Sequence, residues 1–309
     1  MTLAPNDFVH LHVHSEFSLL DGLGRITELV DAAAAQGMDA MALTDHGALY
    51  GAVAFHQAAK AKGIKPIIGV ETYVAPRSMT SKEGKADSQP FHLILLARDY
   101  AGYQNLCRLV TDAHVDGYYY KPRIDREHLA QYSKGLIGLS ACLGGEVAKA
   151  LEVEDWELAR NVAGEYAEIF GTDGFFLELQ DHGLAEQARL NGQLLRLSGE
   201  TGLPLVVTND LHYVRAEQSD AHDVLLCVGT ASNLDTPGRL LPAHVVQVVG
   251  DDEGQAELRR ETEELLVQPP LLGQAVVLDL EVEAVLAEDL RVLAGDGTGE
   301  IPVVDLEGA

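Results

Sequence analysis

The sequence has few cysteines and no long hydrophobic run. Its 309 residues include three cysteines (Cys107, Cys142 and Cys227), an odd number spaced far apart, which argues against a disulfide framework and indicates a reducing compartment. No apolar run reaches the roughly 18 residues that a membrane span needs, and residues 1–6 lack the basic start and apolar core of a signal peptide. We therefore expect a cytoplasmic protein that makes no contact with a membrane.

Positive charge is also scarce. The chain has 22 Lys+Arg against 48 Asp+Glu, and its net charge of -26 counts against a simple electrostatic nucleic-acid binder. Residues 241–309 carry half of this excess and contain no Lys, Phe, Tyr or Trp. We therefore expect a domain at residues 1–239 and an acidic extension at residues 240–309. The extension is either a small partner-binding appendage or a truncated, fused or frame-shifted end without function of its own.

Short apolar strands and helices alternate along the rest of the chain. The pattern predicts strands at residues 9–13, 40–47, 65–74, 91–97, 136–142, 175–179 and 205–212. It predicts helices at residues 26–36, 52–61, 100–114, 145–170 (with a break near residues 154–155) and 185–201. Continuous apolar strands between helices are typical of a parallel sheet covered by helices. Since no glycine-rich dinucleotide-binding turn follows the first strand, we expect an α/β fold with a closed barrel.

Side chains that can bind metals lie near the ends of these strands. His12 and His14 are two residues apart and so share one face of a strand, and the carboxyl ends of barrel strands carry the chemistry. His92 is an exception, because it stands at the start of its predicted strand. The candidate ligands are His12, His14, Asp21, His46, Glu71, His92, Cys142, Asp210 and His212. Each one alone could have an ordinary structural role, but together they suit zinc, manganese or iron better than calcium.

Several motifs that contain these residues resemble a known family. They are His-x-His followed by Asp21, Leu-Thr-Asp-His-Gly, Ile-Ile-Gly-Val-Glu, Phe-His-Leu, Ser-Ala-Cys-Leu-Gly and Thr-Asn-Asp-x-His-Tyr. From about Phe8 to Arg239 the sequence resembles the PHP (polymerase and histidinol phosphatase) domain that begins bacterial replicative DNA polymerase III alpha subunits. The resemblance implies a distorted (βα)7 TIM-like barrel with three divalent metal ions. It also implies the rest of the replicative polymerase and a proofreading subunit as partners.

The resemblance further implies a ligand set for each metal ion. His12, His14 and Asp210 would hold the first ion, and Glu71 would bridge it to the second. His92 and Cys142 would complete the second site, while Asp21, His46 and His212 would hold the third. Every position of the family's pattern is filled in this sequence, which favours catalytic activity.

Clustered metal ions are suited to phosphoryl chemistry, because they generate hydroxide near neutral pH and hold the attacking and leaving oxygens. We therefore expect a 3′→5′ exonuclease that hydrolyses the terminal phosphodiester of a DNA 3′ end, as in proofreading during replication. Asp21, Arg123 and His182 are the candidate catalytic residues, with Arg123 as a phosphate clamp and His182 as a donor to phosphate. Tyr118, Tyr119 and Tyr120 could stack on an unpaired base.

Two other functions remain open at this point. One is a small-molecule phosphatase of the histidinol-phosphate type, which would need the same metal ions and a shallower pocket. The other is a structural or interaction domain that metal ions stabilise without catalysis. We do not expect DNA synthesis, because 309 residues cannot contain the polymerase aspartates of that family.

Overall fold

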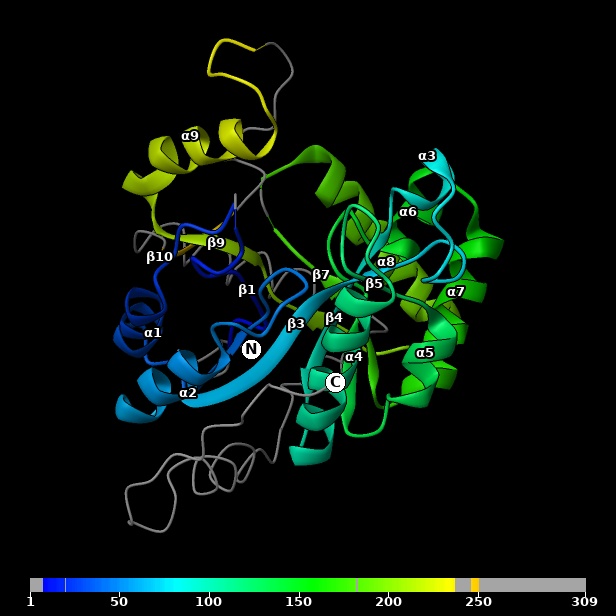
Figure 1. Ribbon diagram of the computed structural model, residues 1–309, viewed down its shortest axis with the longest axis horizontal. Helices are drawn as coiled ribbons and strands as arrows, with labels where there is room; N and C mark the ends of the chain where they lie inside the picture. The colour runs from blue at the N-terminus through cyan, green and yellow to red at the C-terminus, as the bar shows by residue number, and fades with distance from the viewer. Residues whose placement is uncertain (1–7, 20, 182, 237–245, 250–309) are drawn as a thin grey trace, which may run out of the picture.

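The computed structural model describes residues 8–19, 21–181, 183–236 and 246–249 (Figure 1). Its strands are β1 (His12–Val13), β2 (Ala40–Leu43), β3 (Lys65–Val74), β4 (Phe91–Ala97), β5 (Arg123–Ile124), β6 (Leu136–Leu139), β7 (Phe175–Leu179), β8 (Leu205–Val207), β9 (Asp210–Arg215) and β10 (Val246–Val249). Its α-helices are α1 (Ile26–Ala35), α2 (Ala52–Ala61), α3 (Gly84–Asp87), α4 (Tyr100–Val115), α5 (Arg126–Gln131), α6 (Glu146–Glu152), α7 (Trp156–Phe170), α8 (Ala185–Thr201) and α9 (Ser219–Gly229). In these ranges, no helix is both long and apolar enough to cross a bilayer.

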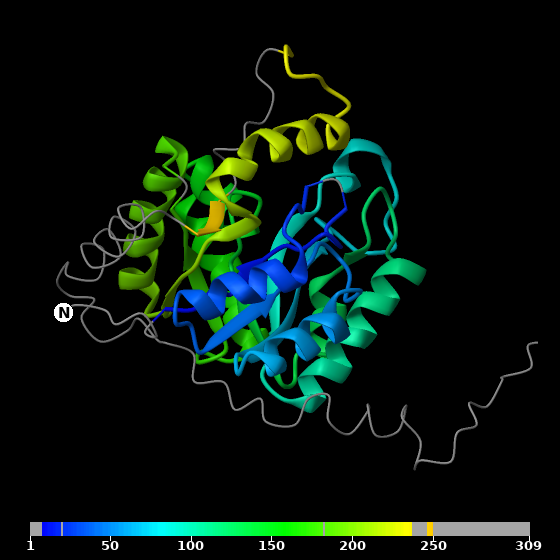
Figure 2. The ribbon, with the colours of Figure 1, turned by 90° about the vertical axis from the view of Figure 1, so that its left-hand side faces the viewer.

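The strands form two sheets in the described part of the chain. The larger sheet has the order β2-β3-β4-β6-β7-β8, with β5 paired to β3, and the smaller sheet has the order β1-β9-β10. Backbone hydrogen bonds from Ala42 N to His10 O and from Thr44 N to Val13 O, both 2.8 Å, join the first strand segment to β2. The result is an α/β fold with a curled, half-barrel sheet (Figures 1 and 2). The closed (βα)7 barrel is not confirmed, because the strands divide between two sheets.

The direction of β4 differs from the prediction. β4 pairs antiparallel with both β3 and β6, whereas the other pairings in the two sheets are parallel. A parallel crossover usually contains a helix, but residues 75–90 contain only the four-residue α3. The chain therefore turns back after β3, and the prediction of an all-parallel sheet is wrong at this strand.

The main helices lie where the sequence predicts them. Helix α2 packs on β3, α4 on β4, α7 on β6 and α8 on β7, so the helices cover the outer face of the larger sheet (Figure 2). The predicted break in the 145–170 helix separates α6 from α7, and the side chain of Asp155 caps α7 by accepting a hydrogen bond from Leu158 N at 3.0 Å. Such a cap stabilises a helix by about 1 kcal/mol.

Side-chain alternation along the strands produces two separate cores. On β3, β4 and β7, Ile68, Leu95 and Leu177 belong to the large core beneath the helices. Their neighbours belong to a second core inside the curl: Leu11, Ala42, Ile67, Ile94, Leu96, Ile137, Leu139, Ala141, Phe176 and Val206. The inside of the curl is therefore filled by apolar side chains, as in barrels whose interior is a packed core.

The acidic extension predicted from residue 240 onward lies outside the described residues, except for β10. That strand pairs in parallel with β9, starting from Val246 opposite Leu211.

Candidate metal centre

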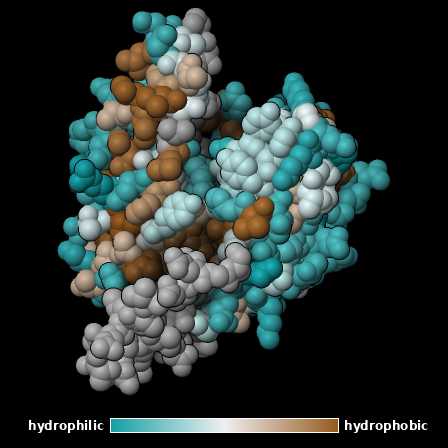
Figure 3. Space-filling view, in the orientation of Figure 1, coloured by the Kyte–Doolittle hydropathy of each residue, from teal (hydrophilic) through white to brown (hydrophobic). Residues whose placement is uncertain are grey.

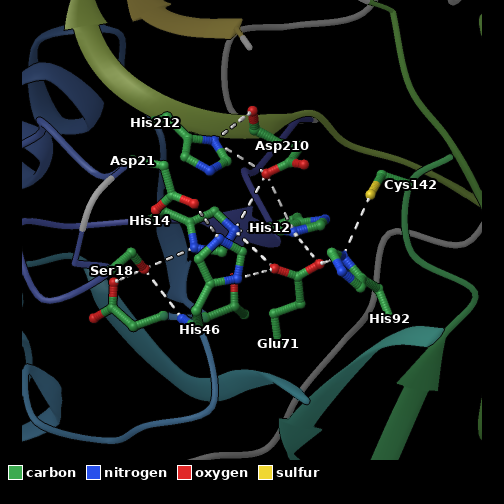
Figure 4. A network of polar contacts seen from close by, with 12 residues as sticks. His12, His14, Ser18, Asp21, His46, Glu71, His92, Cys142, Asp210 and His212 are labelled. Atoms are coloured by element: carbon green, nitrogen blue, oxygen red, sulfur yellow. Dashed lines mark hydrogen bonds and ion pairs between the residues drawn. The ribbon is translucent and has the colours of Figure 1, made fainter. Parts of the chain in front are cut away.

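The nine candidate ligands lie together at one end of the curled sheet (Figure 4). They come from β1 and the loop that follows it, from the turns after β2 and β6, and from β3, β4 and β9. A continuous series of contacts joins His12, His14, Asp21, His46, Glu71, His92, Cys142, Asp210 and His212. The structure thus brings together residues that are up to 200 positions apart in the sequence, as the strand-end pattern predicts.

The antiparallel direction of β4 explains the position of His92. In the β3–β4 pairing, Tyr73 near the carboxyl end of β3 lies opposite His92 near the amino end of β4. The start of β4 therefore reaches the same edge as the carboxyl ends of its neighbours. Alternation then directs Glu71 and His92 to the inner face, because they are in phase with Ile67 and Ile94 of the inner core.

Glu71 is the central residue of the cluster and is fully buried. Its Oε2 atom lies 2.5 Å from Nδ1 of His46 and 3.4 Å from Nε2 of His14. Its Oε1 atom lies 2.5 Å from Nδ1 of His92. The Sγ atom of Cys142 is in turn 3.8 Å from the same His92 nitrogen. The Nε2 atom of His12 lies 3.9 Å from Glu71 Oε1. A single carboxylate therefore contacts four imidazole groups.

Asp210 plays a similar part on the other side of the cluster. Its Oδ1 atom lies 3.3 Å from Nε2 of His12, 3.2 Å from Nε2 of His14 and 3.3 Å from Nδ1 of His212. Asp21 lies at the margin, where its Oδ2 atom is 2.9 Å from Nε2 of His46.

The donor atoms form three overlapping groups, each compact enough to surround one cation. In each group the donor atoms lie within 4.8 Å of one another. The groups are His12, His14 and Glu71; Glu71, His92 and Cys142; and His14, His46 and His212. The first two groups lie within predicted ligand sets, and the third shares His46 and His212 with a predicted set. Glu71 and His14 each belong to two of the three groups.

Several polar atoms of the cluster have no hydrogen-bond partner within the described part of the protein. Both Glu71 carboxylate oxygens and Asp210 Oδ1 are buried without a hydrogen-bond partner in the described part of the chain. Buried polar atoms are normally paired, and an unpaired one is costly. Bound cations would satisfy these oxygens, and the mixture of imidazole, carboxylate and thiol donors suits zinc, manganese or iron. The residues therefore fit a metal centre.

Two histidines of the cluster are oriented by buried residues that are not among the predicted site residues. The Glu178 carboxylate accepts from His12 Nδ1 at 2.9 Å. Ser18 donates its hydroxyl proton to Asp45 at 2.8 Å and therefore accepts from His14 Nδ1, also at 2.8 Å. Both bonds leave Nε2 as the free ring nitrogen, and the two Nε2 atoms lie only 3.1 Å apart. Such outer hydrogen bonds are typical of metal-binding histidines.

The position of Glu178 in the sequence does indicate a buried polar role. Glu178 is an acidic residue within the otherwise apolar strand β7, in phase with Phe176 of the inner core. An acid at such a position must point into the curl, where only a buried polar partner can satisfy it.

The charges of the cluster favour the metal-binding protonation states of Glu71 and His14 but not those of His12 and His46. Burial lowers the pKa of His12 and His46, but the carboxylates beside them outweigh burial, so that the pKa of His12 lies well above its usual range and that of His46 is raised to about 10. Burial raises the pKa of Glu71, but His92 and His46 outweigh burial and hold that pKa well below its usual range. Burial, together with His212 and His46, lowers the pKa of His14 to about 3. An ionised carboxylate and a neutral imidazole are the forms that bind metal ions.

Cys142 differs from the other donors. Burial raises the pKa of its thiol, and the carboxylates of Asp210 and Glu71 raise it further. A nearby cation reverses this effect, since a coordinating thiol loses its proton. The preceding residue, Ala141, has a φ of 61°, a left-handed conformation that is costly for a residue with a side chain. This turn lies directly before the candidate ligand.

Arg123 does not fit the phosphate-clamp role predicted for it from the sequence. The side chain is fully buried, and its guanidinium donates to the carbonyl oxygens of Gly117 (3.0 Å), Asp87 (2.8 Å), Met79 (2.9 Å) and Ser81 (2.8 Å). The prediction is corrected because every nitrogen of the guanidinium already donates to a backbone carbonyl. His182, the predicted phosphate donor, lies outside the described residues.

Comparison with known proteins places this sequence in a family. The PHP domain family matches residues 10–182, more than half of the chain. The chain therefore belongs to the PHP domain family.

Within that family the sequence is similar to the DNA polymerase III subunit alpha of several bacteria. It is 47% identical to that of Treponema pallidum over 239 residues, which are 77% of this chain and 20% of the relative. It is 37% identical to that of Helicobacter pylori over 287 residues, which are 89% of this chain and 23% of the relative. The chain thus spans about a fifth of the length of these relatives, and the second alignment extends past residue 240.

Among solved structures, the chain is similar to a histidinol phosphate phosphatase from Lactococcus lactis that was solved with zinc, L-histidinol and phosphate. The TM-score is 0.36 at 15% identity, covering 77% of this chain and 98% of that one.

Proposed function

We propose that this chain is a metal-dependent phosphodiesterase that removes nucleotides from the 3′ end of a DNA strand. The observation that carries the proposal is the sharing of Glu71 and His14 between neighbouring donor groups. Shared ligands would hold cations a few ångströms apart, which is the spacing that in-line phosphoryl displacement uses.

Three divalent ions, zinc, manganese or iron, would fit the cluster. His12, His14 and Asp210 would hold one ion, and Glu71 would bridge it to a second ion completed by His92 and Cys142. Asp21, His46 and His212 would hold the third ion. When bound, these ions would supply a hydroxide nucleophile near neutral pH and positive charge for the leaving oxygen.

The residues of the chain would position these groups and limit the access of water. The side chain of Asp21 is 29% exposed, against 14% for Asp210 and 1% for Glu71. We therefore assign to Asp21 the contact closest to the substrate. Glu178 would hold the His12 ring in place, and the Ser18–Asp45 pair would hold that of His14.

The relatives suggest a biological setting for this reaction. Since they are DNA polymerase III alpha subunits, we propose that the hydrolysis would serve proofreading in DNA replication. The partners would be the rest of the replicative polymerase and a proofreading subunit.

The test is the release of nucleotides from a 3′-labelled single strand by the purified full chain with Mn²⁺ or Zn²⁺. We expect the wild type to release label, EDTA to stop the reaction, and the combined Asp21→Asn and His12→Gln variant to be inactive. Asp31→Asn, which changes an exposed carboxylate on α1, is the matched control. Hydrolysis that survives in the double variant would refute the assignment.

The same assay separates the other two functions. Turnover of p-nitrophenyl phosphate without release of nucleotides would indicate a phosphomonoesterase of the histidinol-phosphate type. No hydrolysis of either substrate, with a melting temperature that chelation lowers, would indicate a structural role for the metal ions. Elemental analysis of the same preparation identifies the bound metal.

A further inference from the structure

We propose that residues 118–121 form a binding rim for the unpaired end of a nucleic-acid strand, in which Lys121 binds a backbone phosphate and Tyr118 and Tyr120 stack on bases. This inference rests on the proposed phosphodiesterase function. It adds substrate contacts outside the metal cluster.

The position of Lys121 next to the cluster is the first observation. Its side chain is exposed, and its Nζ atom lies 5.1 Å from the centre of the Tyr73 ring and 3.4 Å from the Tyr73 hydroxyl, to which it donates. The Tyr73 ring is stacked on His46 at 6.0 Å and meets His92 edge-on at 5.3 Å. One aromatic ring therefore separates the Lys121 ammonium from two candidate metal ligands.

The exposed aromatic side chains beside Lys121 are the second observation. Tyr118 is 53% exposed and Tyr120 is 68% exposed. Tyr120 has a φ of 60°, a strained conformation for a tyrosine, and its ring packs edge-on against Tyr119 at 4.7 Å. Exposed aromatic rings next to a cation are the usual means of binding single strands without sequence preference.

The loop is held firmly against the metal-site turn, and this is the third observation. Arg123 ties the base of the loop to Gly117 through the carbonyl contact described above. A side chain at Gly47, the residue after the ligand His46, would come within 2.7 Å of Pro122 Cγ, so the two segments are in close contact. A fixed loop binds with less loss of conformational entropy than a loose one.

The charge of the molecule makes this cation important. At a net charge of -26, the protein as a whole repels a phosphate backbone. A single ammonium at the edge of the cluster gives the strand a local point of attachment beside the site where hydrolysis is proposed.

The first experiment measures binding without hydrolysis. Fluorescence anisotropy of a labelled oligothymidylate with phosphorothioate linkages at its 3′ end is recorded with the full chain at low salt, with Mn²⁺ and again with EDTA. The variants are Lys121→Ala, Tyr118→Ala, Tyr120→Ala and the conservative pair Tyr118→Phe and Tyr120→Phe. Lys62→Ala is the control, because Lys62 is exposed, pairs with Asp31 and precedes the far end of β3.

We expect Lys121→Ala to weaken binding and to reduce the slope of log affinity against log salt by about 0.7, the value for one phosphate contact on a single strand. Each Tyr→Ala change should weaken binding at least about 5-fold, while the Phe variants keep wild-type affinity because the ring remains. The inference is overturned if Lys121→Ala behaves like Lys62→Ala, or if the alanine and phenylalanine variants bind alike.

A second experiment separates failure of this inference from failure of the proposed function. KM and kcat are measured for a 3′-labelled oligonucleotide and for p-nitrophenyl phosphate. The Tyr→Ala variants should raise KM for the oligonucleotide and leave the small substrate unaffected, and an unchanged KM would overturn the inference. If the wild type hydrolyses neither substrate, the proposed function is wrong. The binding experiment alone then tests whether residues 118–121 bind a nucleic-acid strand.

Discussion

Two buried polar regions of this molecule differ in how their charges are satisfied. The Arg123 guanidinium donates to four backbone carbonyl oxygens and lies over the Tyr119 ring, 5.2 Å from its centre. At the Glu71 cluster, by contrast, imidazole nitrogens and carboxylate oxygens crowd together while both Glu71 oxygens remain without a hydrogen-bond partner in the described part of the chain. The first region is satisfied as folded, whereas the second fits a bound ligand. We propose that the Arg123 charge serves stability and that the Glu71 cluster serves metal binding.

The largest expected effect on activity comes from removing the shared carboxylate. Glu71→Gln keeps the size of the side chain but weakens two of the three donor groups at once. We expect hydrolysis to fall on the order of 100-fold or more and metal content to drop in elemental analysis. Glu168→Gln, an exposed change on α7, is the control. Full activity with normal metal content in Glu71→Gln would show that the Glu71 carboxylate is not needed for metal binding or hydrolysis, so that it would not differ from the Arg123 region in needing a ligand.

Removing the satisfied charge should act on stability. Arg123→Met leaves four carbonyl oxygens without their donor, and we expect the free energy of unfolding in urea to fall by about 3–5 kcal/mol. Arg160→Met, which breaks an exposed pair with Glu200, should cost less than about 1 kcal/mol. If Arg123→Met were as stable as the wild type and bound DNA less tightly, the phosphate-clamp role would be restored.

A smaller effect is expected from the residue that orients His12. Glu178→Gln keeps the volume but loses the carboxylate that fixes the Nδ1 proton, and we expect metal affinity to fall about 10- to 100-fold. The d–d spectrum of the Co²⁺-substituted protein should shift as well, which a change in packing alone would not cause. Unchanged affinity and spectrum would make Glu178 a packing residue only.

The smallest effect concerns a buried histidine outside both regions. Burial lowers the pKa of His10 to about 3, so below the ordinary pKa near 6.5 the unfolded chain binds the proton more readily than the folded one. Stability should therefore fall as the pH drops, and His10→Phe should remove about 2 kcal/mol of this loss between pH 7 and pH 5. Urea unfolding of both proteins at the two pH values measures the difference. Equal pH dependence would contradict it.

Local pattern was enough to predict most elements of this fold. Helix α2 occupies the residues that its spacing predicts, and the break before α7 lies at the predicted place. These features depend on neighbours within a few positions, where hydrophobic periodicity and capping act. The meeting of His12, Glu71 and Asp210 followed from one further rule, that the ends of neighbouring strands share an edge.

Features that depend on long-range geometry were not predictable in the same way. The apolar residues of β4 do not indicate the direction of the strand. Because a parallel strand was assumed, His92 was predicted at the end of the sheet opposite to the other candidate ligands. The sequence does not distinguish Arg123 from an exposed loop arginine. Its four hydrogen-bond partners are backbone carbonyls, which every residue type has, so they cannot be recognised in the sequence. Glu178 could have been found from its place in a buried strand, but its partner His12 is 166 residues away.

The membership of Glu71 and His14 in two donor groups each has a consequence for how the site fills. Under the proposed metal binding, a cation taken up by one group would alter the electric field and the side-chain positions that the adjoining group offers, so successive occupancies would be thermodynamically linked rather than independent. A titration with metal should then deviate from a sum of separate hyperbolas.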